Sequence, residues 1–83
     1  MTGVHLIMEY IRVLLYGLPE AIKGFTVYYF DDDGMAYYTM FINAKLNVES
    51  QCSVYDHEMQ HINNNDFNSM YSADNLEMLR HVV

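Results

Sequence analysis

The stretch FTVYYF-DDDG-MAYYTMFIN, residues 25–43, decides the fold class of this chain. Its two ends are rich in β-branched and aromatic residues, which is typical of β-strands. Between them, Asp33 and Gly34 form an Asp-Gly pair, which favours a tight hairpin turn because both residues tolerate a positive φ. The sequence therefore predicts strands over 25–30 and 35–43, joined as a β-hairpin.

The segment before the hairpin has apolar residues at helical spacing. They recur along residues 4–16 on one face of a helical projection. Gly17 is a suitable C-cap, and Pro19 soon afterwards prevents the helix from continuing. We therefore expect a first amphipathic helix over residues 4–16.

Two more helices are predicted after the hairpin. Asn47 is a favourable N-cap for a helix over residues 48–63, and Ser72 can cap a last helix over 73–82. The expected order is helix, hairpin, helix, helix, which is an α+β fold. With 83 residues and no linker or repeat, the chain is expected to form a single domain over 1–83.

Composition excludes several classes of function. The formal net charge is −7, with only four Lys and Arg residues, so direct nucleic-acid binding is not expected. No run of about 20 apolar residues is present to cross a membrane, and the N-terminus lacks the features of a signal peptide. A single cysteine allows no internal disulfide and fits a reducing compartment. We therefore expect a cytoplasmic protein. The exposed edge of the predicted sheet favours pairing with another strand, and a second copy of the chain is one candidate partner.

The strongest functional motif is HEMQH, residues 57–61, an H-E-x-x-H sequence inside the helix predicted over 48–63. Residues four apart in a helix lie one turn along and about 40° around its axis, so both imidazoles can reach one ion. Zinc binds neutral imidazole nitrogen in tetrahedral sites. The motif predicts a zinc site with His57 and His61 as ligands and Glu58 as the general base.

The helical projection places this pair away from the expected packing seam. The histidines fall roughly opposite the apolar stripe and share their face with Val54, and Glu58 lies between the two faces. Core histidines would lie on the stripe, so the projection favours a ligand role. We also expect Cys52 to be a small buried side chain. The stripe consists of Val48, Cys52, Tyr55, Met59 and Ile62.

A third metal ligand has to come from outside this helix. Asp66 follows the motif by only five residues and is better placed to shape the turn. On the last predicted helix, Asp74, Glu77 and His81 share one face. Packing of that helix against the motif helix would direct Glu77 or His81 toward the metal, and the spacing alone leaves these alternatives open.

The run YTMFINAKLNVESQCSVYDHEMQHINNNDF, residues 38–67, resembles the ImmA/IrrE family of metallopeptidase-like proteins, in particular its short members from Firmicutes and their mobile elements. The GLPxxIKGFT-like segment is present at residues 17–26 and the INxxL-type strand end at 42–46. An N-N-D-F tail at 64–67 follows the H-E-x-x-H motif. The similarity covers roughly residues 17–81.

This resemblance implies a minimal zincin-like fold, with the motif histidines as zinc ligands and the motif glutamate as catalytic base. It implies a third, acidic ligand on the following helix, which corresponds best to Glu77. The chain departs there from the family's E-x-E-A pattern, with Leu79 and Arg80 at the last two positions. Larger relatives cleave helix-turn-helix repressors encoded beside them, so the implied partner is a protein substrate such as a transcriptional regulator.

Two functional hypotheses follow. In the first, the chain is a zinc endopeptidase that hydrolyses a peptide bond in a protein substrate, which binds as an added strand beside residues 36–43. In the second, it is a non-catalytic protein-interaction module of a mobile element that retains the metal for stability. Loss of cleavage on replacement of Glu58 would distinguish the first from the second.

Overall fold

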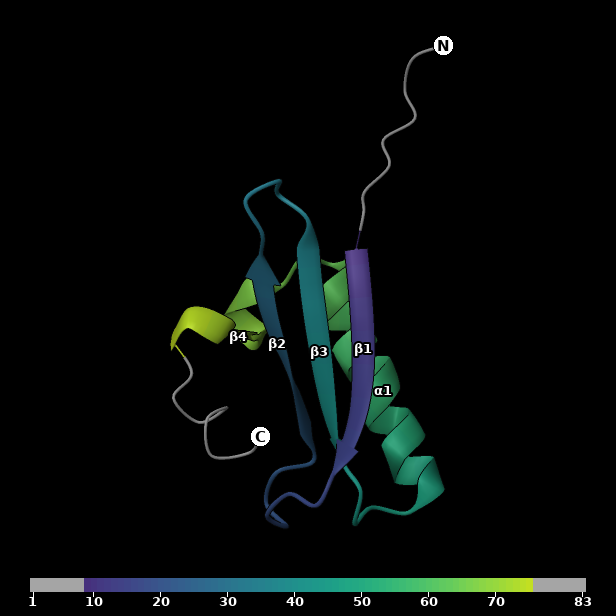
Figure 1. Ribbon diagram of the computed structural model, residues 1–83. Helices are drawn as coiled ribbons and strands as arrows, with labels where there is room; N and C mark the ends of the chain where they lie inside the picture. Colours follow the sequence, from purple (N-terminus) through teal and green to yellow (C-terminus); the bar gives the residue numbers. More distant parts are fainter. Residues whose placement is uncertain (1–8, 76–83) are drawn as a thin grey trace.

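Four strands form one sheet in the order β1-β3-β2-β4, and the helix α1 packs on one face of it (Figure 1). The computed structural model describes residues 9–75. The chain is thus a small α+β protein, as expected from its sequence. The strands are β1 (Glu9–Tyr16), β2 (Gly24–Phe30), β3 (Ala36–Asn43) and β4 (Tyr71–Ser72); the helix is α1 (Val48–Asn63), and two short 3₁₀ turns are η1 (Phe67–Ser69) and η2 (Ala73–Asn75).

The predicted hairpin is confirmed. β2 and β3 pair antiparallel, from Gly24 opposite Ile42 to Phe30 opposite Ala36. In the turn, the Asp31 carboxylate accepts hydrogen bonds from the backbone N–H groups two and four residues later, each at 2.9 Å. Gly34 adopts a φ of 82°, the left-handed conformation for which glycine is favoured. The Asp-rich turn is therefore held by its own side chain.

The helix predicted over residues 4–16 is wrong for residues 9–16, which form strand β1. β1 runs parallel to β3, with Glu9 opposite Ala36 and Tyr16 opposite Asn43. The segment EYIRVLLY is rich in aromatic and β-branched residues, and this composition favours a strand. The spacing of its apolar residues favours a helix equally well. Its backbone groups find partners on β3, and this tertiary pairing decides between the two. Residues 4–8 lie outside the described residues.

The helix predicted over residues 48–63 is confirmed as α1. The Asn47 side chain caps it by accepting a 2.8 Å hydrogen bond from the backbone N–H of Ser50. Of the last predicted helix, over 73–82, only the 3₁₀ turn η2 falls within the described residues. Among the helices of residues 9–75, none is long and apolar enough to span a membrane.

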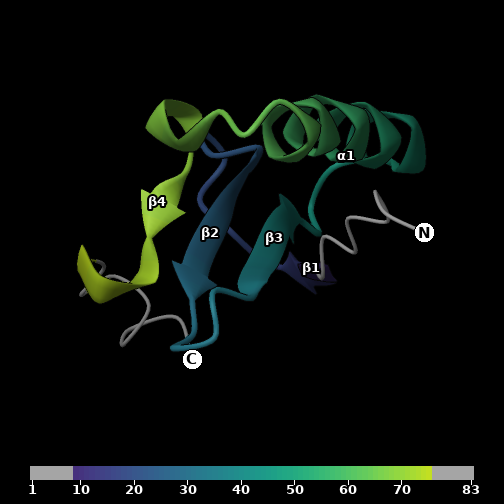
Figure 2. The same cartoon turned by 90° about the horizontal axis from the view of Figure 1, so that it is seen from above.

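Two apolar clusters lie on the two faces of the sheet. Alternate residues of β3 point to opposite sides, so this central strand contributes to both. Seen from above, α1 covers one face, whereas η2 lies on the other side of the sheet (Figure 2). The cluster on the α1 face has the buried core Ala36, Tyr38, Met40, Ile42, Ile62 and Met70; that on the opposite face has Leu18, Phe25, Val27 and Phe41, with Ala73 packed against it.

The packed side of α1 differs from the apolar stripe expected from the sequence. Val48 is 73% exposed, and Cys52, expected to be buried, is exposed. The buried residues of the helix are Glu58 and Ile62, and Val54 also packs against the core. The helix is thus rotated so that the glutamate of the H-E-x-x-H motif faces the sheet.

Asn43 fixes the loop that leads into β2. Its side chain is buried at the end of β3, where it accepts hydrogen bonds from the backbone N–H groups of Leu18 and Lys45. Its amide nitrogen donates to the carbonyl oxygens of Leu18, Pro19 and Ile22 at 2.9–3.2 Å. This one side chain therefore satisfies several loop groups that strand pairing leaves unpaired.

Gly24, the first residue of β2, lies directly against α1. A Cβ atom there would stand 2.6 Å from both the Phe41 carbonyl oxygen and Val54 Cγ1. Both distances are too short for carbon contacts, and one of the opposing atoms is backbone. Only glycine therefore allows α1 to lie this close to the start of β2.

We predict that Gly24→Ala lowers the free energy of unfolding by about 1–3 kcal/mol, because α1 and β3 must move apart to admit the methyl group. Gly17→Ala is the matched control, since a Cβ at Gly17 meets nothing closer than Lys45 Cε at 3.9 Å. Urea unfolding followed by circular dichroism measures both. Equal midpoints for the two variants would contradict this account of the packing.

Candidate metal centre

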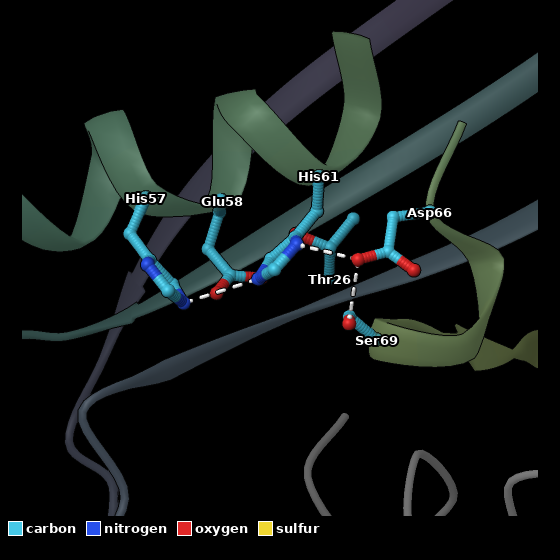
Figure 3. A network of polar contacts seen from close by, with 6 residues as sticks. All are labelled: Thr26, His57, Glu58, His61, Asp66 and Ser69. Carbon is cyan, nitrogen blue, oxygen red and sulfur yellow. Dashed lines mark hydrogen bonds and ion pairs between the residues drawn. The ribbon is translucent and has the colours of Figure 1, made fainter. Parts of the chain in front are cut away.

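The two motif histidines converge on one point. His57 and His61 lie one turn apart in the second half of α1, and their Nε2 atoms are 3.0 Å from each other. The ring planes stand nearly perpendicular, at 86°. Figure 3 shows both rings directed toward the same space, with the Glu58 carboxylate beside them. The helical spacing thus produces the juxtaposition that the sequence predicted.

The donor set fits a zinc ion. Two imidazole nitrogens bound to one zinc at about 2.05 Å in a tetrahedron lie about 3.3 Å apart, close to the observed 3.0 Å. A Glu58 oxygen completes a group in which all ligand atoms lie within 4.8 Å of one another. Imidazole nitrogen is a ligand type that zinc accepts, and the nearby carboxylate suits the general base of such a site.

Glu58 is held by the sheet. Its side chain is only 6% exposed, and its Oε1 accepts a 2.8 Å hydrogen bond from the hydroxyl of Thr26, which is fully buried on β2. Burial of a carboxylate is costly unless it is hydrogen-bonded. Oε2 accepts no hydrogen bond from the part of the chain that the structure describes. The carboxylate is therefore fixed through one oxygen, and the other is left for chemistry at the site.

Asp66 orients the second histidine. Its Oδ2 lies 3.2 Å from His61 Nδ1 and also accepts a 2.8 Å hydrogen bond from the Ser69 hydroxyl. Asn65, with a φ of 52°, reverses the chain after α1 and brings Asp66 back beside the helix. A carboxylate on Nδ1 favours the tautomer with its proton there, which leaves Nε2 free to bind a metal.

Of the four candidates for a third ligand, the structure describes two, Asp66 and Asp74. Asp66 contacts His61 Nδ1 and not the nitrogen that faces His57, so in a metal site it would orient His61 and would not itself be a ligand. Asp74 is exposed in η2, whose first residue packs on the sheet face opposite α1, and it does not join the cluster. Glu77 and His81 lie outside the described residues, so the assignment of Glu77 as third ligand stays a prediction.

Sequence reasoning missed the residues that support the motif. Thr26 lies 32 residues before Glu58, and no spacing rule links them. Ser69 was also missed, although its position three residues after Asp66 is typical of a local turn contact. The His61–Asp66 pair had a usable signal, because a carboxylate shortly after a ligating histidine is a common orienting partner.

An open pocket of ≈ 630 Å³ runs from His57 and Glu58 along the first half of α1. Its wall on the sheet side is the start of β2, and its other wall is the helix. Polar side chains predominate toward the helix N-terminus. The lining residues are Lys23, Gly24, Leu46, Glu49, Ser50, Ser53, Val54, His57 and Glu58.

The strand edge beside this pocket belongs to β2. The expectation that a peptide adds beside residues 36–43 is wrong, because β3 is paired on both sides, with β1 and β2. β4 pairs only with Val27 and Tyr28 of β2. The Lys23 carbonyl accepts from Asn43 on β3, so by the alternation of an antiparallel ladder the peptide groups of Gly24 and Thr26 point to the other side. The Thr26 carbonyl is used by β4, because the parallel pairing of Val27 with Tyr71 joins Tyr71 to the outward groups of Thr26 and Tyr28, and Thr26 is fully buried. Within residues 9–75 no strand pairs with Gly24 on that side.

No protein-family model matches this chain, and no curated protein or solved structure matches it either. The resemblance to the ImmA/IrrE family therefore stays a prediction from the sequence motifs.

We predict that Asp66→Asn weakens zinc binding about 10–100-fold, because the amide no longer holds the His61 tautomer as a carboxylate does. His57→Ala should abolish tight binding, since it removes a ligand. Asp32→Asn, an exposed change in the hairpin turn, is the control for charge. Competition against a chromophoric chelator measures all three affinities. An unchanged affinity in Asp66→Asn would show that the His61 contact has no role in binding.

Proposed function

We propose that this chain is a zinc-dependent metallopeptidase-type domain with a minimal zincin-like architecture of the ImmA/IrrE kind. The observation that carries the proposal is the convergence of His57 and His61 Nε2 beside the Glu58 carboxylate. The Asp66 contact behind His61 and the Thr26 contact behind Glu58 support it, because both hold chemically reactive groups in fixed orientations. His57, His61 and, as a prediction, Glu77 hold the ion.

The residues of the site suit peptide hydrolysis. A bound zinc ion supplies Lewis-acid polarisation of the scissile carbonyl and lowers the pKa of water. Glu58 Oε2 takes a proton from the attacking water and delivers it to the leaving nitrogen. The Thr26 hydroxyl keeps Oε1 in place, so the carboxylate presents the same oxygen in both transfers. The general base is therefore positioned by the sheet as well as by its own helix.

The proposed substrate is an extended segment of a protein, such as a transcriptional regulator. The outward peptide groups of Gly24 lie on the strand that walls the pocket, where an extended peptide can add to the sheet. Such a peptide would run past His57 and Glu58. Main-chain hydrogen bonds supply affinity in this binding mode, and the pocket along α1 would receive a side chain.

Glu58→Gln is the direct test of the mechanism. We expect this variant to retain zinc and to lose cleavage by about 10²–10⁴-fold, because an amide cannot accept the proton. Glu20→Gln, an exposed loop change of the same type, is the matched control. Peptide-library digestion read by mass spectrometry, with zinc content measured in parallel, checks both. Cleavage by Glu58→Gln at the wild-type rate would refute the mechanism.

Zinc should also stabilise the fold. A ligand that binds only the folded state at 100 times its dissociation constant adds about 2.7 kcal/mol, so zinc should raise the melting temperature and a chelator should lower it. The shift should be absent in His57→Ala, and elemental analysis of Glu77→Ala should show a reduced zinc stoichiometry. Zinc-dependent stability without cleavage of any peptide would favour the non-catalytic interaction module.

A further inference from the structure

The outer edge of β1 is unpaired among the residues that the structure describes. β1 ends the strand order, with β3 on its inner side (Figure 1). The Tyr16 carbonyl accepts a 2.7 Å hydrogen bond from the N–H of Ala44, which directly follows β3. Since peptide groups alternate in direction along a strand, those of Ile11, Val13 and Leu15 point outward. These three residues offer a row of free donors and acceptors.

The side chains along this edge are apolar and exposed. Ile11, Val13 and Leu15 lie on the α1 face of the sheet at 39%, 41% and 57% exposure. α1 packs mainly against β2 and β3, and these three side chains stay in large part exposed beside it. On the opposite face Tyr10 is 54% exposed. A long, exposed, apolar edge strand is a template for pairing with another strand.

The sequence of the edge is self-complementary. Residues 10–16, YIRVLLY, read as aromatic, aliphatic, Arg, Val, Leu, aliphatic, aromatic, with Val13 at the centre. An isologous dimer needs a surface that matches itself under a twofold rotation. We propose that two copies of this chain pair through antiparallel β1 strands with Val13 on the twofold axis, so that their two sheets form one continuous sheet.

The hydrogen-bonding pattern restricts the register. Residues directly opposite in an antiparallel pair must both direct their peptide groups across the interface, or both away from it. Because the outward groups belong to Ile11, Val13 and Leu15, odd-numbered residues must face odd-numbered ones. The two α1 helices then lie on the same face of the joined sheet. In the proposed register Val13 faces Val13 of the second copy, and Ile11 faces Leu15.

Charge selects between the two longest registers that satisfy this rule. Centring the pair on Arg12 would place two guanidinium groups opposite each other, and directly opposed like charges are destabilising. Centring it on Val13 places Arg12 opposite Leu14. Residues 10–16 contain no acidic side chain in a chain with eleven of them, so the paired strands bring no carboxylates together. The overall charge of −7 still repels, and added salt should strengthen the dimer.

Aromatic packing supports the same register. On the face opposite α1, Tyr10 stacks on Tyr37 at 5.3 Å, and Tyr37 stacks on Tyr29 at 4.7 Å. A second row runs from Tyr16 to Phe41, at 5.7 Å between ring centroids. Each row ends at β1. The Val13-centred register sets Tyr10 opposite Tyr16 of the second copy, at the spacing at which cross-strand aromatic pairs interact, and so joins the rows across the interface.

The main test is sedimentation equilibrium from about 1 µM to about 1 mM, since a single strand pair forms a small interface. We expect a dimer whose dissociation constant rises at least about tenfold in Val13→Lys, which places two cations opposite each other at the axis. Val48→Lys is the matched control, because Val48 is exposed on α1 away from this edge. Melting curves verify that both variants fold. A monomer throughout, or a dimer unaffected by Val13→Lys, overturns the proposal.

Cross-linking tests the register. In a Cys52→Ser background, Val13→Cys should form an intermolecular disulfide under mild oxidation, because Cα atoms of a hydrogen-bonded pair lie about 5.5 Å apart. Ile11→Cys, which retains Arg12, should cross-link at least about tenfold more slowly, because Ile11 faces Leu15 in this register. Equal rates, or the reverse order, would overturn the Val13 register. These measurements require neither zinc nor cleavage, so their outcome is separate from that of the proposed function.

Discussion

The hydrogen bond from the Thr26 hydroxyl to the Glu58 carboxylate joins the only α-helix of residues 9–75 to the sheet. Glu58 lies on the packed side of α1, where a helix ordinarily carries an aliphatic residue. A buried carboxylate contributes less to stability than an aliphatic group of similar size. Both side chains are buried, so removal of either one would leave the other without a hydrogen-bond partner, and water could not take its place. A polar pair retained at such a position supports a chemical role for Glu58, because departures from ordinary packing gather at functional sites.

This contact also explains why the helix is rotated. The apolar stripe counted from the sequence predicts a buried seam that includes Val48 and Cys52, yet both are exposed. Glu58 instead faces the sheet, with Val54 and Ile62 packed on the core beside it. The rotation carries the two histidines toward the start of β2, because both lie on the same side of Glu58 around the helix axis. Gly24 permits it, since a larger residue at the start of β2 would hold α1 away.

The fold was predictable where the determining contacts are local. The hairpin depends on the Asp33-Gly34 turn, and α1 depends on the Asn47 cap and its own periodicity, so residues close in sequence specify both. β1 was mispredicted because its partner, β3, lies more than twenty residues away and pairs in parallel. Its segment satisfies helical spacing and strand composition together. The signal that favoured a strand was the group of aromatic and β-branched residues at Tyr10, Ile11, Val13 and Tyr16.

The candidate site also combines features set by nearby residues with features set by distant ones. The spacing of His57 and His61 follows from helix geometry alone, so their convergence was predictable. The groups that orient them were predictable only in part, because Asp66 is near in sequence while Thr26 comes from a strand 32 residues away. The same limit applies to the candidates for a third ligand. Helical spacing groups Asp74 with Glu77. The path of the chain after β4, however, takes η2 to the other face of the sheet, and spacing does not predict this path.

The two edges of the sheet have separate proposed uses, and this separation has an energetic consequence. β1 and β2 lie on either side of β3, about 10 Å apart, so pairing at one edge leaves the other accessible. A chain of 83 residues can bury only a modest core. Metal binding and self-association each stabilise the folded state by mass action, and at this separation their contributions should be nearly additive. In the proposed dimer both α1 helices would lie on one face of the joined sheet, so the two candidate metal sites would be on the same side.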